Sequence, residues 1–231
     1  ARRLTGEKAP SRYVMPTSCP ACGRRLERAP EAVVWRCPNV HCLAKLRRGL
    51  LHYAGRRAMC IEGLGEALVE QLVESQLVRD PAHLYGLTVE DLTELAPDGK
   101  KKIPGMGKKS AGKLVLEIER SKGRDFANVL FGLGIRHVGE RAASLLARRF
   151  AGLAGLLLAS AAEIEDVVGI GPTVAESVRA FLDDPVTRRL LVRLEAAGVN
   201  MKSGRVGSGQ TAKPLNGQTF VLTGTLQSMS R

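Results

Sequence analysis

Four cysteines in the first fifth of the chain have the spacing of a metal site. They form one Cys-x2-Cys pair and one Cys-x4-Cys pair with fourteen residues between the pairs: Cys19, Cys22, Cys37 and Cys42. Two short-spaced pairs can converge on one tetrahedral ion, and four thiolates around Zn²⁺ leave no position open for a substrate. The spacing therefore predicts one structural zinc ion.

Other interpretations of the cysteines stay open on sequence alone. Two disulfides would use the same four residues, although the odd fifth cysteine and the lack of a secretion signal disfavour them. His41 is adjacent to Cys42 and is an alternative ligand, but four cysteines already complete the shell. Cys60 stands apart, and we expect it to be a small buried apolar side chain.

A second pattern is a Gly-apolar-Gly triplet followed by apolar residues at helical intervals. Its four copies are 63–65, 105–107, 132–134 and 169–171. Glycine permits a sharp turn, and the first N–H groups of the following helix are unpaired at the positive end of its dipole. Such a turn binds phosphate without reading bases. The pattern predicts helix, tight hairpin and helix, repeated four times.

The copies differ in the charge that follows them. Lys108 and Lys109 follow the second copy, which makes it the best candidate for phosphate contact, whereas Glu66 follows the first, where a purely structural turn explains the glycines equally well. The predicted DNA-contacting residues are Gly63, Gly65, Gly105, Gly107, Lys108, Lys109, Gly132, Gly134, Arg136, Gly169, Gly171 and Thr173.

Composition favours a polyanionic partner. The chain has 231 residues, 44% of them apolar, with 35 Lys/Arg against 23 Asp/Glu and a formal net charge of +12. Two basic zones, 1–57 and 98–124, flank an acidic one, 58–97. This pattern favours phosphate contact. Aromatic residues at 4% argue against stacking on single strands, and no apolar run is long enough to span a membrane.

These signals predict a mainly α fold in which a small zinc finger precedes an all-helical domain. We expect a basic lead-in at 1–16, a four-cysteine zinc finger with little regular structure at 17–57, and four hairpins packed as two pairs at 58–200. A flexible linker is expected at 201–214 and a strand-like stub at 215–231.

This order of modules closely resembles the C-terminal half of bacterial NAD+-dependent DNA ligase. Residues 59–65, 103–111 and 130–139 resemble the first three helix–hairpin–helix motifs of that family. Residues 215–226 resemble the opening strand of its BRCT domain. The resemblance covers nearly the whole chain from about residue 14 onward.

The resemblance implies a parent enzyme that seals nicks in duplex DNA, with AMP taken from NAD+ by the lysine of a Lys-x-Asp-Gly motif. That motif is absent, and its nearest match, 96–99, begins with Ala96. The resemblance therefore implies a catalytically inactive DNA-binding part and a truncated BRCT start. NAD and a divalent cation such as magnesium would be bound upstream. We expect a monomer that binds double-stranded DNA, especially nicked duplex, in the bacterial cytoplasm near the nucleoid, without a membrane partner.

Three alternatives remain. The same modules fit a DNA-repair scaffold of another family, although recombination mediators place the hairpin before the zinc site. A protein-interaction module explains the folds but not the basic zones beside glycine turns. A self-contained enzyme is disfavoured because the metal site is closed and no nucleophile–base pair stands out.

Overall fold

The structure is a computed structural model that describes residues 14–28, 33–39, 42–93 and 106–204. Most of the lead-in, His41, Gly105, most of the linker and the BRCT-like segment lie outside the described residues. Within that part of the chain the fold is mainly α, as predicted, with three isolated β-bridges and no longer strand. The helices are α1 (Leu43–Ala54), α2 (Glu66–Glu74), α3 (Pro81–Leu84), α4 (Val89–Thr93), α5 (Lys108–Ser121), α6 (Phe126–Gly132), α7 (Glu140–Phe150), α8 (Leu153–Leu158), α9 (Ala161–Glu165), α10 (Pro172–Asp183) and α11 (Pro185–Ala196).

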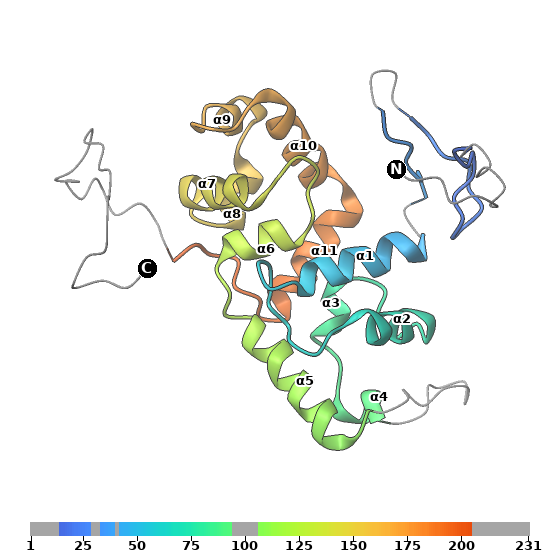
Figure 1. The fold of residues 1–231 in the computed structure, drawn as a ribbon. Helices are drawn as coiled ribbons and strands as arrows, with labels where there is room; N and C mark the ends of the chain where they lie inside the picture. Colours follow the sequence, from blue (N-terminus) through green and yellow to red (C-terminus); the bar gives the residue numbers. More distant parts are fainter. Residues whose placement is uncertain (1–13, 29–32, 40–41, 94–105, 205–231) are drawn as a thin grey trace, which may run out of the picture.

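The helices pair around the glycine turns. Helix α1 packs on α2, α4 on α5, α6 on α7 and α9 on α10, so each second helix packs on the helix before it (Figure 1). Helix α11 packs on both α10 and α3, which links the end of the domain to its first half. The prediction of four helix–hairpin–helix units is therefore confirmed in the described residues.

One continuous apolar core holds these units together. It extends along the chain from Leu50 in α1 to Met201 after α11. In α5, Ala111, Leu114 and Ile118 are buried at intervals of three and four residues, which is the spacing of one helix face. No helix among the described residues has both the length and the apolar character needed to cross a membrane.

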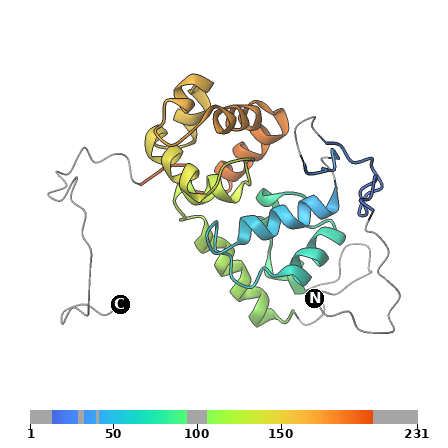
Figure 2. The ribbon, with the colours of Figure 1, turned by 45° about the horizontal axis from the view of Figure 1, so that its top comes forward.

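Helix α1 belongs to this core, so the expectation of little regular structure across 17–57 is wrong for its last third. Helix α1 packs on both α2 and α6, near the middle of the helical domain in Figure 2. Tyr53 is fully buried, and its hydroxyl lies 2.8 Å from the hydroxyl of Tyr85, which in turn lies 3.2 Å from Ser121 Oγ. Burial raises the pKa of Tyr53, so the phenol stays protonated. Helix α1 is thus the first helix of the first hairpin.

The helical domain also continues past residue 200, where the linker was expected to begin. Met201 and Ser203 are buried, and the backbone N–H of Ser203 donates to Ala151 O at 3.0 Å. Gly152 makes this approach possible, because a Cβ there would lie 2.6 Å from Met201 O. The prediction of a flexible linker is therefore wrong for residues 201–203.

Gly132 fills a similar role inside the core. It is the last residue of α6 and is buried. A Cβ on it would lie 3.2 Å from both the Ala58 Cβ and the Tyr53 Cδ2. The missing side chain lets α6 approach the end of α1 closely.

We expect Gly132→Val to lower the free energy of unfolding by about 2 kcal/mol, because the added carbons overpack a buried contact. This cost outweighs the roughly 0.4 kcal/mol gained in helix propensity. Urea denaturation of both proteins measures the difference. A variant as stable as the wild type would show that this contact tolerates a side chain.

Candidate zinc centre and nucleic-acid interface

The four predicted cysteines converge on one point. Their Sγ atoms all lie within 4.8 Å of one another, with 3.9 Å between Cys19 and Cys42 and 3.4 Å between Cys22 and Cys37. Zn–S bonds of about 2.3 Å in a tetrahedron place sulfurs about 3.8 Å apart, whereas a disulfide needs about 2.05 Å. The arrangement fits one zinc ion held by four thiolates and does not fit two disulfides.

Short backbone contacts hold the first pair in place. The N–H of Cys19 donates to Arg24 O at 2.7 Å, and the N–H of Gly23 donates to Cys19 O at 2.8 Å. Gly23 has φ +70°, the left-handed conformation that glycine adopts without strain. A bridge between Glu27 and Arg36 then returns the chain to the second pair.

The last cysteine joins the zinc centre to the helical domain. Cys42 is the N-cap of α1, and its carbonyl accepts from the N–H of Leu46 at 3.0 Å. A thiolate at a helix N-terminus is stabilised by the positive end of the helix dipole. The metal site and α1 are therefore anchored by the same residue.

As free thiols the cysteines differ in acidity. Hydrogen bonds from the Arg24 backbone and the Asn39 side chain lower the pKa of Cys22 to about 6. Desolvation, reinforced by Cys22, raises the pKa of Cys37 to about 11. Binding of one divalent ion by four thiolates displaces the protons from all four sulfurs, so the difference in protonation disappears. This is the usual coupling of zinc binding to thiol deprotonation.

Cys60 lies outside this cluster and departs from its expected role. It is half-buried rather than buried, and its backbone has φ +54°. It lies between α1 and the 63–65 turn, within the first hairpin, and the described residues give it no chemical function.

The turns at 63–65, 106–107 and 169–171 have the predicted geometry. Gly65, Gly107 and Gly171 are the N-caps of α2, α5 and α10. Gly63 and Gly169 have φ +90° and +94°, the left-handed values that favour glycine. Leu64 and Ile170, between the glycines, are buried and fix each turn to the core, and Met106 packs partly against it.

The register predicted for the third hairpin is wrong. Gly132 and Gly134 precede the turn, which runs over 135–139 and ends at Gly139, the N-cap of α7. His137 takes the position of the first glycine and has φ +63°. Buried Ile135 and Val138 match the apolar residues of the other turns. Gly132-Leu133-Gly134 matches the triplet, but its glycines pack and cap α6 instead.

Side-chain caps are present on four helices and absent from the second helix of each hairpin, as they are from α1 and α8. Asp80, Asp125, Ser160 and Asp184 cap α3, α6, α9 and α11 with side-chain oxygens. The N–H of Thr187 donates to Asp184 at 2.8 Å, and this bond lowers the pKa of the carboxyl group. The second helices α2, α5, α7 and α10 instead begin at glycine, without a side-chain cap.

These four N-cap glycines are not needed for backbone shape or packing. Their φ values lie between −85° and −109°, which any residue adopts, and a Cβ would meet no atom of the described residues within 4 Å: Gly65, Gly107, Gly139 and Gly171. Three are exposed and Gly171 is half-exposed. Each helix therefore offers uncovered backbone N–H groups toward open space.

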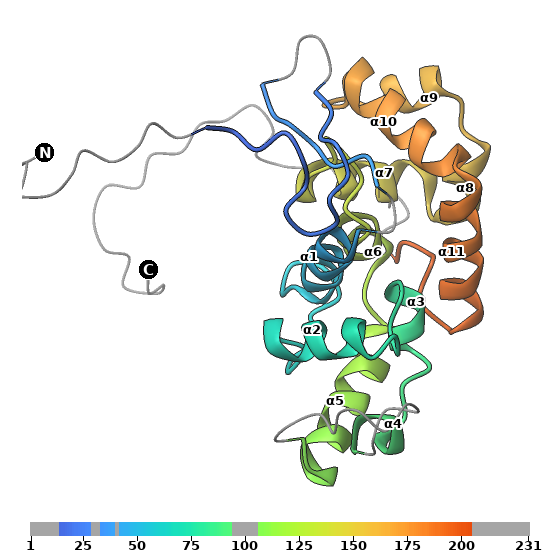
Figure 3. The same cartoon turned by 90° about the vertical axis from the view of Figure 1, so that its right-hand side faces the viewer.

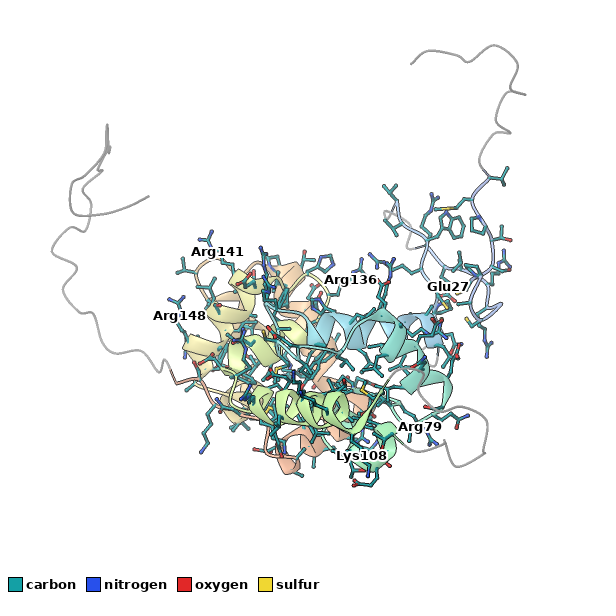
Figure 4. All side chains as sticks on the ribbon, turned by 60° about the horizontal axis from the view of Figure 1, so that its bottom comes forward. Glu27, Arg79, Lys108, Arg136, Arg141 and Arg148 are labelled. Carbon is teal, nitrogen blue, oxygen red and sulfur yellow. The ribbon has the colours of Figure 1, made fainter. Side chains whose placement is uncertain are left out.

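Exposed basic side chains lie next to the second and third helix starts, whereas the first begins with Glu66. Lys108 and Lys109 are exposed at the start of α5, and Arg136 is exposed before α7, on the opposite edge of the view in Figure 4. In contrast, Arg47 of α1 donates to Glu70 and Glu74 of α2, at 2.6 and 2.9 Å. These ion pairs thus fix α1 against α2.

Cys37→Ser is expected to abolish zinc binding and to disorder the segment from Cys19 to Cys42. The four-sulfur shell supplies the folding free energy of a segment with few apolar contacts. Zinc content by atomic absorption and helicity by circular dichroism measure the two effects. Helicity should stay near the wild-type value because the apolar core, which runs from Leu50 to Met201, includes none of the four cysteines. A large loss of helix would show that the core depends on the metal.

Comparisons with known proteins agree with this arrangement. Residues 18–44 match the NAD-dependent DNA ligase C4 zinc finger domain, residues 58–120 the SAM-like helix-hairpin-helix tandem, and residues 128–191 the helix-hairpin-helix motif. The DNA ligase of Desulforudis audaxviator is 47% identical over 99% of this chain, that of Anoxybacillus flavithermus 44%, and that of Desulforamulus reducens 42%. The chain spans about one third of the length of these relatives, at 32 to 33%.

The zinc finger match coincides with the four-cysteine cluster, and the two helical matches contain the four glycine-capped helix starts. The chain belongs to the NAD-dependent DNA ligase family and corresponds to the C-terminal portion of its members.

Proposed function

We propose that this chain is the part of an NAD+-dependent DNA ligase that holds duplex DNA around a single-strand nick. The observation that carries the proposal is the set of four glycine N-caps. Ser, Thr, Asp and Asn are better N-caps, and the same chain uses Asp and Ser at four other helices. Glycine at the second helices gives up this stabilisation and keeps the N–H groups open to an anion.

The anion is best explained as the DNA backbone. Backbone N–H groups contact phosphate but no base edge, so the grip should be independent of sequence. The basic side chains Lys108, Lys109 and Arg136 lie beside two of the starts. In the third hairpin we assign the contact to Gly139 rather than to Gly132, which is buried against α1. Thr173, exposed in the first turn of α10, remains a proposed contact.

The chemistry of ligation falls outside this chain in the proposal. The ligase reaction transfers AMP from NAD+ to a 5′-phosphate with a divalent cation such as magnesium, and the sequence has no Lys-x-Asp-Gly nucleophile. Zinc has a structural role in this proposal, because four thiolates fill its coordination shell. We place the zinc finger boundary at Cys42, where α1 begins, and we expect a monomer near the bacterial nucleoid.

Duplex binding by the zinc-loaded chain should be steeply salt-dependent and equal or better on nicked than on intact duplex. Each neutralised phosphate contributes about 0.9 to the slope of log affinity against log salt. Fluorescence titrations with nicked, intact and single-stranded DNA at two salt concentrations test this. Affinity that does not change with salt, or a preference for single strands, would contradict the proposal and favour a protein-interaction module.

The charge-reversal variant Lys108→Glu/Lys109→Glu is the matched test of the second hairpin. Loss of two phosphate contacts should make the slope shallower by about two and weaken binding roughly 60-fold at 0.1 M salt. Both side chains are exposed, so stability in urea should not change. Unchanged affinity would remove this hairpin from the interface.

Gly139→Val and Gly171→Val test the open helix starts themselves. A side chain there meets no atom of the described residues but lies in the path of a phosphate, so binding should fall at least tenfold, while stability falls by only about 1 kcal/mol because Val is a poorer N-cap than Gly. Gly132→Val is the contrasting variant, since it should destabilise the core. Wild-type affinity in both N-cap variants would show that DNA does not approach these helices.

A further inference from the structure

The turn after α1 is fixed by hydrogen bonds to its backbone carbonyls, including those of two arginines. The guanidinium groups of these arginines take no part in those bonds. Asn128 Nδ2 donates to Arg57 O at 2.9 Å, and Arg124 Nε donates to Ala58 O at 3.1 Å. A second nitrogen of Arg124 lies 3.4 Å from Arg56 O. Three consecutive carbonyls are thus fixed by side chains from the α5–α6 region. The side chains of Arg56 and Arg57 remain exposed.

Arg57 faces the start of the third hairpin's second helix. Its guanidinium lies 3.6 Å from the carboxylate of Glu140, the first residue of α7. Both side chains are more than half exposed, at 78% and 56%, so the pair contributes at most about 1 kcal/mol and exchanges readily for another anion.

A hollow of about 190 Å³ adjoins this pair. Glu140, Ser144 and Arg148 line it from one face of α7 at intervals of four residues, while Arg57 and Asn128 line it from the turn and α6. In Figure 4, Arg148 and Arg141 are labelled on the left of the helical domain and Lys108 at its lower edge.

One further carboxylate lines the hollow but is already engaged. Asp125 accepts from the N–H of Ala127 at 2.9 Å and from that of Gly204 at 3.2 Å. The carboxylate of Glu140 is therefore the anion next to Arg57 in the absence of a ligand.

We propose that Arg57 and Arg148 bind a DNA phosphate across this hollow, with Glu140 as an internal competitor that the phosphate displaces. The proposal rests on the proposed function and adds a contact to the glycine-capped starts. Two guanidiniums match the charge and geometry of a phosphodiester. The fixed turn presents Arg57 with little loss of backbone freedom, because its carbonyls are already bonded.

A simpler explanation is that Arg57 only neutralises Glu140 and supports the fold. The two explanations differ in how the residues couple. If Arg57 contacts phosphate, its removal should weaken binding whether or not Glu140 is charged. If Arg57 only offsets Glu140, its removal should have no effect once the carboxylate is gone.

The test is a double-mutant cycle on the zinc-loaded full chain with intact duplex DNA as the probe. Arg57→Gln should weaken binding roughly eightfold at 0.1 M salt and reduce the salt slope by about 0.9. Glu140→Gln should strengthen binding. Arg57→Gln should cost the same factor in the Glu140→Gln background. Arg148→Gln should resemble Arg57→Gln.

Arg189→Gln is the matched control. Arg189 is an exposed arginine on α11, which lies on the opposite side of the molecule from α1 and the zinc centre in Figure 3. It should change affinity less than twofold, and urea denaturation should show that all variants fold.

Three results would overturn the inference. An effect of Arg57→Gln equal to that of Arg189→Gln, or one that disappears in the Glu140→Gln background, would exclude Arg57 while leaving the glycine starts in place. Absence of duplex binding by the folded wild type would refute the proposed function and this contact together.

Discussion

Cys42 imposes the constraint on which the arrangement of the other parts depends. It closes the sulfur cluster and begins α1, and α1 then enters the core, where it packs on both α2 and α6. A four-sulfur metal shell is stiff, and a packed helix is also stiff, so the zinc finger is attached to the hairpins by one residue and not by a linker. Arg47 and its two glutamate partners brace the same helix against α2. Two glutamates of the acidic zone thus support the helix that carries the basic zinc module.

The helix starts show how stability and binding are separated in this fold. The chain caps α3, α6, α9 and α11 with acidic or hydroxyl side chains and leaves α2, α5, α7 and α10 uncapped. Each uncapped start still has a buried apolar residue or a partly buried methionine before it, which sets its position in space. The core therefore determines where the N–H groups point. The glycines have no side chain to cover these groups, so an anion can reach them.

Sequence reasoning predicted the metal site fully and the hairpins in part. Cysteine spacing is local, so it required no knowledge of distant contacts. A pair of glycines does not mark the third turn, because His137 takes the left-handed position that glycine holds in the first and fourth turns. The pattern apolar-x-x-apolar-Gly, as in Ile135 to Gly139, does mark it. The end of the basic zone at residue 57 does not coincide with a structural boundary, since α1 begins at Leu43 and packs in the helical core. The roles of Arg57 and Gly152 depend on contacts that are distant in sequence, with Asn128 and Met201.

The uncapped starts also link the folded state to its ligand. Because the first amides of these helices lack partners, their ends should fray and exchange hydrogen with solvent faster than the capped helices do. A phosphate at such a start would do for the helix what Asp184 does for α11, so bound DNA would act as a missing cap. Ligand binding then adds directly to fold stability by mass action. If the proposed contacts form, bound DNA would complete the caps of these helices and would stabilise the domain while it is bound.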